Sequence, residues 1–179
     1  MDDVVWDGSA FDDSVDRHLA RWRGKAPYDE TVEAVITRVQ MLAKQVANTK
    51  RRMHDKVGLQ APEFETLHRL AARDDRRATP SELAAELLLS GAGMTGRLDA
   101  LEQAGLIRRI RGTADRRRVD VELTDAGHAR WLEGMRLQGL IENDIVQVLD
   151  AAERDQVNAL LKKMLLRAEQ HAAEGADVA

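Results

Sequence analysis

Six arginines fall within eleven positions in the second half of the chain. They are Arg108, Arg109, Arg111, Arg116, Arg117 and Arg118. A guanidinium group is always charged and presents a rigid set of donors that matches phosphate oxygens. The chain as a whole is acidic, with a formal net charge of -4. Because the positive charge is local, the chemistry it suits best is binding to the phosphate backbone of a nucleic acid.

The remaining residues give no pattern for catalysis, a metal or a cofactor. The chain has no cysteine, which excludes disulfides and thiolate metal sites. Its five histidines show no close ligand spacing, no glycine-rich phosphate loop follows a strand, and no Ser/His/Asp set surrounds a nucleophile elbow. We therefore expect neither an enzyme, nor a metal site, nor a cofactor.

The elements around the arginines predict a hairpin behind two short helices. Thr79 as N-cap, Pro80 and Glu82 form a capping box that opens the first helix, and Ser90 caps the second. The second helix carries an inward stripe of Met94, Leu98 and Leu101 and stops at Gly105. The segments "LIRRI" and "RVDVELT" are β-rich, with "RGTAD" as the tip between them.

This order of elements is that of a winged helix-turn-helix, a DNA-binding unit. The second helix of such a unit enters the major groove of double-stranded DNA. The arginine-tipped hairpin, or wing, reaches along the backbone or into the minor groove, where the negative potential favours arginine. The acidic remainder of the chain limits non-specific binding.

Helices are predicted on both sides of this unit. We divide the chain into an acidic tail (1–11), an extra helix with a long amphipathic helix ending near Gly58 (12–57), the DNA-binding lobe (58–124), two C-terminal helices (125–172) and a frayed tail (173–179). The helix from 125 is expected to end near Leu149. The long terminal helices have apolar faces that need a partner. No apolar run is long enough to span a membrane, and the N-terminus is acidic where a signal peptide would be basic and then apolar, so we expect a cytoplasmic, nucleoid-associated protein.

The chain resembles the MarR family of winged-helix transcriptional regulators. The most specific match is the wing motif of Asp115, Arg117, Leu123 and Thr124, followed by "DAG". The stretches "PSELAAELLLS", "MTGRLDALEQAGLIRR" and "LDAAERDQVNALLKKML" support it. The resemblance implies a mainly α fold with a small β-hairpin wing, in which N- and C-terminal helices form a homodimerisation layer. It also implies a small-molecule effector that binds between this layer and the lobe and weakens DNA affinity.

The resemblance assigns DNA contacts to the wing and to the second of the two short helices, which Ser90 caps. In the wing they are Arg116, Arg117 and Arg118, with Asp115 orienting Arg117 or the hairpin. In the helix, Ser90, Thr95 and Arg97 are candidates, although Arg97 could equally pair with an acid inside the lobe. Two other basic clusters are interpreted differently. Arg76 and Arg77, in a charged turn with Asp74 and Asp75, balance surface charge, and the run from Lys50 to Arg52 lies on an exposed helix face.

The extra N-terminal helix also resembles that of a urate-responsive subgroup of the family. Matching positions give Trp22, Glu65 and Arg109 as ligand residues, whereas the remaining arginine of that set falls at Ala72, and Arg73 replaces it only with a one-residue shift. Losing a bidentate arginine argues against urate and leaves another anionic metabolite or an aromatic inducer open. The alternatives are core packing for Trp22 and a simple helix acid for Glu65.

The function predicted from these residues is that of a dimeric repressor released by an anionic or aromatic effector. Its operator would be pseudopalindromic, with half-sites about 34 Å apart. The alternative is a helical protein-protein interaction module whose arginine loop binds an acidic partner. An enzyme acting on a small molecule is the weakest of the three, since no nucleophile or cofactor cradle is present.

Overall fold

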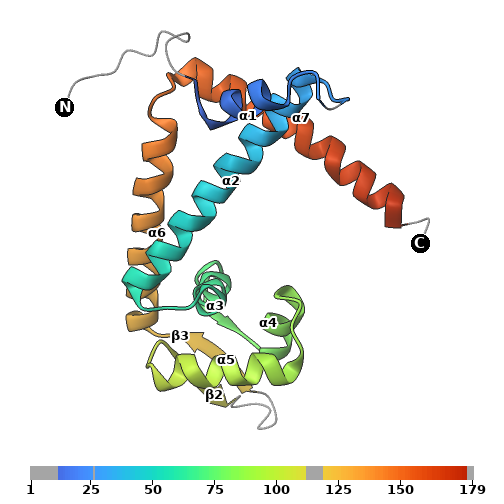
Figure 1. Ribbon diagram of the computed structural model, residues 1–179. Coiled ribbons are helices and arrows are strands. Elements are labelled where there is room, and N and C mark those ends of the chain that lie inside the picture. The colour runs from blue at the N-terminus through green and yellow to red at the C-terminus, as the bar shows by residue number, and fades with distance from the viewer. Residues whose placement is uncertain (1–11, 26, 112–118, 177–179) are drawn as a thin grey trace, which may run out of the picture. The chain divides into compact units, whose positions relative to one another are not determined.

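The computed structural model describes residues 12–25, 27–111 and 119–176 (Figure 1). Residues 12–140 belong to one compact unit and residues 141–176 to another. The described helices are α1 (Ser14–Trp22), α2 (Glu30–Val57), α3 (Ala61–Ala71), α4 (Pro80–Glu86), α5 (Gly91–Gln103), α6 (Asp125–Val146) and α7 (Ala151–Ala176); the strands are β1 (Arg77–Ala78), β2 (Ile107–Arg111) and β3 (Val119–Leu123). The prediction of a mainly α fold with a small β wing is confirmed, while the domain boundaries stay a prediction.

Side-chain caps begin the helices of the lobe where the sequence places them. The Thr79 hydroxyl accepts a hydrogen bond from the Glu82 amide at 3.2 Å, and the Glu82 carboxylate accepts from the Thr79 amide at 2.7 Å. The Ser90 hydroxyl accepts from the Gly93 amide at 3.2 Å. These contacts satisfy amides that have no partner inside the helix, and they fix the short interval between α4 and α5.

A three-stranded antiparallel sheet in the order β1-β3-β2 lies beside these helices. In β3, Glu122 is opposite both Arg77 of β1 and Arg108 of β2. The prediction that Arg77 lies in a charged turn is wrong, because Arg77 begins β1. A two-residue strand is too short to show the alternation by which a strand is predicted.

Two predicted helix ends differ from the structure. Helix α6 ends at Val146 rather than near Leu149, and α7 continues to Ala176 rather than stopping near residue 172. The alanines near the end of α7 favour helix, which explains why the helix outlasts its apolar stripe.

The hydrophobic core of the lobe is formed by α3, α4, α5 and the sheet. Its fully buried side chains include Leu67, Leu70, Leu83, Met94, Leu98, Leu101, Ile107 and Val121. The predicted inward stripe of α5 is confirmed, since its three members are at most 1% exposed. Packing on one side of α5 leaves its other side at the surface (Figure 1).

Two long helices keep apolar side chains at the surface of the single chain. On α2 they are Val32, Val35, Ile36, Val39, Met41 and Leu42, and on α7 they are Val157, Leu160, Leu161, Met164, Leu165 and Leu166. Rows of exposed apolar residues of this size are uncommon on monomeric proteins. Within the described ranges, no helix is both long and apolar enough to cross a lipid bilayer.

Replacing Gly127 by alanine is expected to destabilise the lobe. A Cβ there would lie 2.0 Å from the carbonyl oxygen of Leu106, which accepts a hydrogen bond from the Thr124 amide at 3.1 Å. Backbone cannot yield as a flexible side chain does, so we expect a loss of about 1–3 kcal/mol in the free energy of unfolding, measured by urea titration.

Gly139→Ala on the same helix is the matched control. No atom lies within 4 Å of a Cβ built at Gly139, so this variant should gain up to about 1 kcal/mol through helix propensity. Equal stability of the two variants would contradict this account of α6.

Candidate nucleic-acid interface

The outward face of α5 is built from small residues. Gly91, Ala92, Gly93, Thr95 and Gly96 are all exposed. A Cβ at Gly91 or Gly96 would meet no atom within 4 Å, so no contact inside the protein requires glycine there. The Thr95 hydroxyl donates to the Gly91 carbonyl at 2.9 Å. The face is smooth and lets the helix backbone approach a groove closely.

Arg97 turns toward α3. Its side chain is half-buried, and its guanidinium donates to the Thr66 hydroxyl at 3.4 Å. Thr66 is fully buried and itself donates to the Pro62 carbonyl at 3.0 Å. Of the two interpretations drawn from the sequence, the contact favours the internal one, with a hydroxyl in place of the expected acid.

Glu122 on the central strand holds both edges of the sheet. Its carboxylate accepts from the Arg77 guanidinium at 2.7 and 3.0 Å and from that of Arg108. Hydrogen bonds from Arg108 and then Arg77 hold the pKa of the Glu122 carboxyl below its ordinary value, and the same contact raises the pKa of Arg108. The base of the wing is therefore fixed by charge as well as by the β ladder.

Arg109 fastens the wing strand β2 to α5. Its guanidinium donates to Asp99 at 2.6 Å and to Glu102 at 2.5 Å, and its amide donates to Glu102 at 2.9 Å. The hydrogen bond to Asp99, with a further contribution from Glu102, raises the pKa of Arg109 against the opposing effect of its burial. These contacts give Arg109 a structural role that the resemblance did not suggest.

Four of the predicted DNA-binding or orienting residues fall in the segment between β2 and β3. Asp115, Arg116, Arg117 and Arg118 lie outside the described residues. The two strands that flank this segment, β2 and β3, are paired up to Arg111 and Val119. The sheet thus brings both ends of the arginine-rich segment together next to α5.

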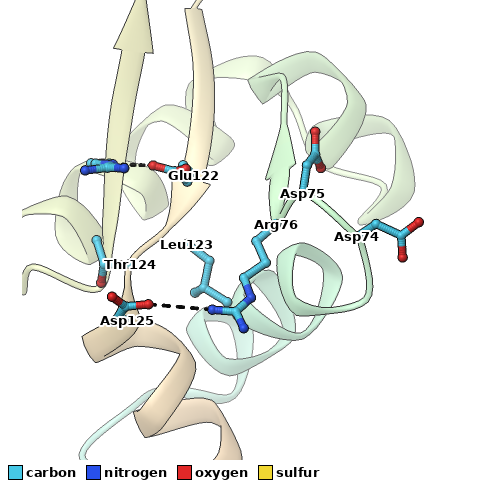
Figure 2. A pocket seen from close by; sticks show the side chains of 8 residues that line it. Asp74, Asp75, Arg76, Glu122, Leu123, Thr124 and Asp125 are labelled. Carbon is cyan, nitrogen blue, oxygen red and sulfur yellow. Dashed lines mark hydrogen bonds and ion pairs between the residues drawn. The ribbon is translucent and has the colours of Figure 1, made fainter.

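A pocket at the opposite end of β3 is lined by Arg76, one of the two arginines assigned to surface balance. It has a volume of about 320 Å³, and Figure 2 shows that the Arg76 guanidinium points toward the Asp125 carboxylate, at 3.7 Å. Arg76 also has a positive φ of 54°. With Arg77 bound to Glu122, both side chains face acids of this chain, as the surface-balance interpretation expects.

Of the four residues suggested for ligand binding, Arg73 and Glu65 line two different pockets. Trp22 ends α1 with 45% of its surface exposed, and Glu65 pairs with Arg69 one turn later at 2.9 Å. Arg73 forms an ion pair with Glu86 and donates to the Arg69 carbonyl at 2.7 Å. Arg109, as described, is bound to α5.

Glu65 does line a pocket of about 230 Å³ between α2, α3 and α6. The other lining residues are Lys50, His54, Ala61, Phe64, His68, Met135 and Gln138. His54 Nδ1 is buried without a hydrogen-bond partner among the described residues, and burial lowers the pKa of this imidazole. His68 Nδ1 accepts from the Trp131 indole at 3.1 Å.

Sequence reasoning missed the two imidazoles of this pocket because it tested them only as metal ligands. Lys50 with His54, and Ala61 with Glu65 and His68, follow helical spacing on one face of α2 and α3, which is a signal that could have found them. Among the residues that the structure describes, no group of three or more histidines and acids could hold a metal ion.

A winged helix-turn-helix is defined here by the helices α4 and α5, the three-stranded sheet and the two strands that lead into the wing. Residues 57–118 match the model of the MarR family. Over 152 residues the chain is 33% identical to the transcriptional regulator PecS of Dickeya dadantii (strain 3937), covering 82% of this chain and 89% of PecS. The chain therefore belongs to the MarR family and is a transcriptional regulator rather than an enzyme.

Solved structures share this fold. The YusO protein of Bacillus subtilis superposes with a TM-score of 0.70 at 23% identity, covering 79% of this chain and 99% of YusO. The MepR protein of S. aureus, in a complex with DNA, superposes with a TM-score of 0.63 at 24% identity, covering 72% of this chain and 96% of MepR. Both likenesses concern the fold.

Glu122→Gln is expected to lower the free energy of unfolding by about 1 kcal/mol at neutral pH, because two guanidinium groups lose a charged acceptor. The folded pKa of Glu122 lies below the ordinary value of 4.5. The contribution of ionised Glu122 to the free energy of unfolding is therefore complete above its unfolded pKa and is lost as pH falls through its folded pKa.

Thermal unfolding of wild type and Glu122→Gln between pH 7 and about pH 3 tests this linkage. The two melting temperatures should differ at pH 7 and converge at the acid end. Glu133→Gln, at an exposed position of α6, is the control and should track wild type throughout. A gap between wild type and Glu122→Gln that does not change with pH would rule out the ion-pair account.

Proposed function

We propose that this chain is a homodimeric repressor that binds a pseudopalindromic operator and is released by a small anionic or aromatic effector. The observation that carries the proposal is the placement of the exposed face of α5 beside the two strands that lead into an arginine-rich wing. This is the arrangement by which a helix enters the major groove while a wing follows the backbone.

In this proposal the arginines at the wing tip neutralise phosphates. Arg116, Arg117 and Arg118 contact the backbone or the minor groove, and Asp115 orients Arg117 or the hairpin. Ser90 and Thr95 face the groove from α5. Arg97 positions α5 through Thr66, since its guanidinium is directed there. A protein that binds an operator in this way acts in the cytoplasm, at the nucleoid.

The apolar faces of α2 and α7 support a homodimer. Each helix has six large apolar residues at the surface of the single chain, and a second copy supplies apolar faces of the same kind to cover them. A twofold dimer presents two α5 helices, which fits half-sites about 34 Å apart, one turn of the DNA helix.

The pocket between α2, α3 and α6 supports an effector site. It joins apolar side chains, Phe64 and Met135, with a cation at Lys50 and an imidazole nitrogen on His54 that has no described partner. A planar aromatic anion would pack its ring against the two apolar side chains and direct its charge to Lys50 and His54. Of the ligand residues suggested by the sequence, Glu65 belongs to this site.

Arg117→Ala is expected to weaken binding to the DNA upstream of the protein's own gene and to flatten its salt dependence. Removing one phosphate contact reduces the slope of log K against log salt by about 0.9, so a dimer loses about 2. Fluorescence anisotropy over a salt series, with scrambled DNA of equal length beside it, measures both effects, and size-exclusion chromatography confirms that the dimer persists.

Arg52→Ala, which removes the same charge from the exposed face of α2, is the matched control and should keep the wild-type slope. If Arg117→Ala kept the wild-type affinity and slope, the wing would have no role in DNA binding. Equal, weak binding of both duplexes by wild type would favour a protein partner for the arginine loop.

Ala61→Phe is expected to abolish release by effector while leaving operator binding intact. Ala61 lines the pocket from an exposed position, so a phenyl ring there fills the cavity without displacing core residues. Benzoate and urate titrated into the protein-operator complex supply an aromatic and a purine anion. Ala129→Phe, at an exposed position of α6 outside the pocket, should respond as wild type does. Release of Ala61→Phe at wild-type concentrations would exclude this pocket.

A further inference from the structure

Leu88, in the turn between α4 and α5, has an unusual combination of exposure and backbone conformation. Its side chain is 93% exposed, and its φ of 52° places it in the left-handed region. A leucine is sterically strained in this conformation, whereas glycine is not. An apolar side chain that is strained and in water at the same time contributes nothing visible to the fold.

The backbone here is required by the end of α4. The Leu89 amide donates to the Ala84 carbonyl at 2.8 Å and the Leu88 amide donates to the Ala85 carbonyl at 3.3 Å. These two bonds form the helix end in which the residue after the C-cap must be left-handed, a position that strongly favours glycine. Leu89 then packs on the core of the lobe. The turn therefore fixes the conformation of Leu88 but gives no reason for its side chain.

The neighbouring face of α5 has few groups that could recognise bases by hydrogen bonds. Its exposed residues near the N-terminus are glycines, Ala92 and Thr95, preceded by the N-cap Ser90. The hydroxyl proton of Thr95 is used within the helix, and the hydroxyl oxygen of Ser90 caps it. Arg97 is directed toward Thr66. Leu88 lies two residues before the N-cap Ser90, next to the end of α5 that meets base edges in a helix-turn-helix.

We propose that Leu88 is a specificity-determining residue that contacts the 5-methyl group of a thymine in each operator half-site. The thymine methyl is the apolar group that the major groove exposes, and it distinguishes thymine from the other bases. The left-handed turn holds the leucine outward, so its contact surface is in place before DNA binds. This inference rests on the proposed function, in which α5 enters the major groove.

The test compares thymine with deoxyuridine, which lacks only the methyl group. Thymines of the operator are replaced by deoxyuridine one symmetric pair at a time, and affinity is measured by fluorescence anisotropy. For the wild-type dimer, one pair of replacements should weaken binding about fifteenfold, about fourfold for each half-site, as expected for losing burial of one methyl group. Leu88→Gly and Leu88→Ala should bind the thymine operator more weakly than wild type and show no deoxyuridine effect at that pair.

The two variants separate the side chain from the backbone. Leu88→Gly relieves the left-handed strain and should raise the melting temperature by a few degrees, whereas Leu88→Ala keeps the strain and should melt close to wild type. Their DNA affinities should nevertheless be alike, because both lack the isobutyl group. Reduced binding by the more stable variant is an outcome that damage to the fold cannot produce.

The possible failures are distinct. Specific operator binding by wild type with no deoxyuridine pair above twofold overturns the role of Leu88 and leaves the repressor function standing. Variants that lose affinity but keep the wild-type deoxyuridine effect also overturn it. If wild type shows no sequence-selective duplex binding, the proposed function fails, and the inference fails with it.

Discussion

The ion pairs of Arg109 with Asp99 and Glu102 are the constraint on which the proposed interface depends, because they join the strand that enters the wing to the helix beside it. A helix in a groove and a wing on a backbone must keep a fixed separation to bind together. Arg109 is half-buried, so its pairs are less screened than those at an open surface. The core stripe of Met94, Leu98 and Leu101 then fixes the remaining freedom of the helix.

The arginine-rich segment divides into two groups with different tasks. Arg108 and Arg109, at its start, are neutralised by acids of the same lobe, namely Glu122, Asp99 and Glu102. Their charge holds the sheet and the helix in place. In the proposed function, attraction for phosphate therefore falls to the later members of the segment. Part of the high count of arginines in this hairpin therefore holds the lobe together, a role that composition alone does not distinguish from binding.

Local signals in the sequence predicted much of the fold, and contacts between distant segments account for what was missed. The capping box at Thr79, the cap at Ser90 and the stripe of α5 are local patterns, and they lie where predicted. The pairing of Arg77 with Glu122 joins residues 45 positions apart and has no local signature. In the candidate site, the two short helices and the hairpin could be predicted from the sequence. The partners of Arg109 and the positive φ of Leu88 could not, since both depend on tertiary packing.

Helix α3 gives the proposed effector pocket a physical route to the DNA-binding face. Phe64 and Glu65 line the pocket, and the next residue, Thr66, accepts from Arg97 of α5. A ligand changes DNA affinity only if it binds the two arrangements of the lobe unequally. Thr66 is fully buried, so water cannot replace its hydrogen bond with Arg97 when α3 shifts. In the proposed function, displacement of α3 would reach α5 through this contact, and the helix that bounds the pocket would set the angle at which α5 meets the groove.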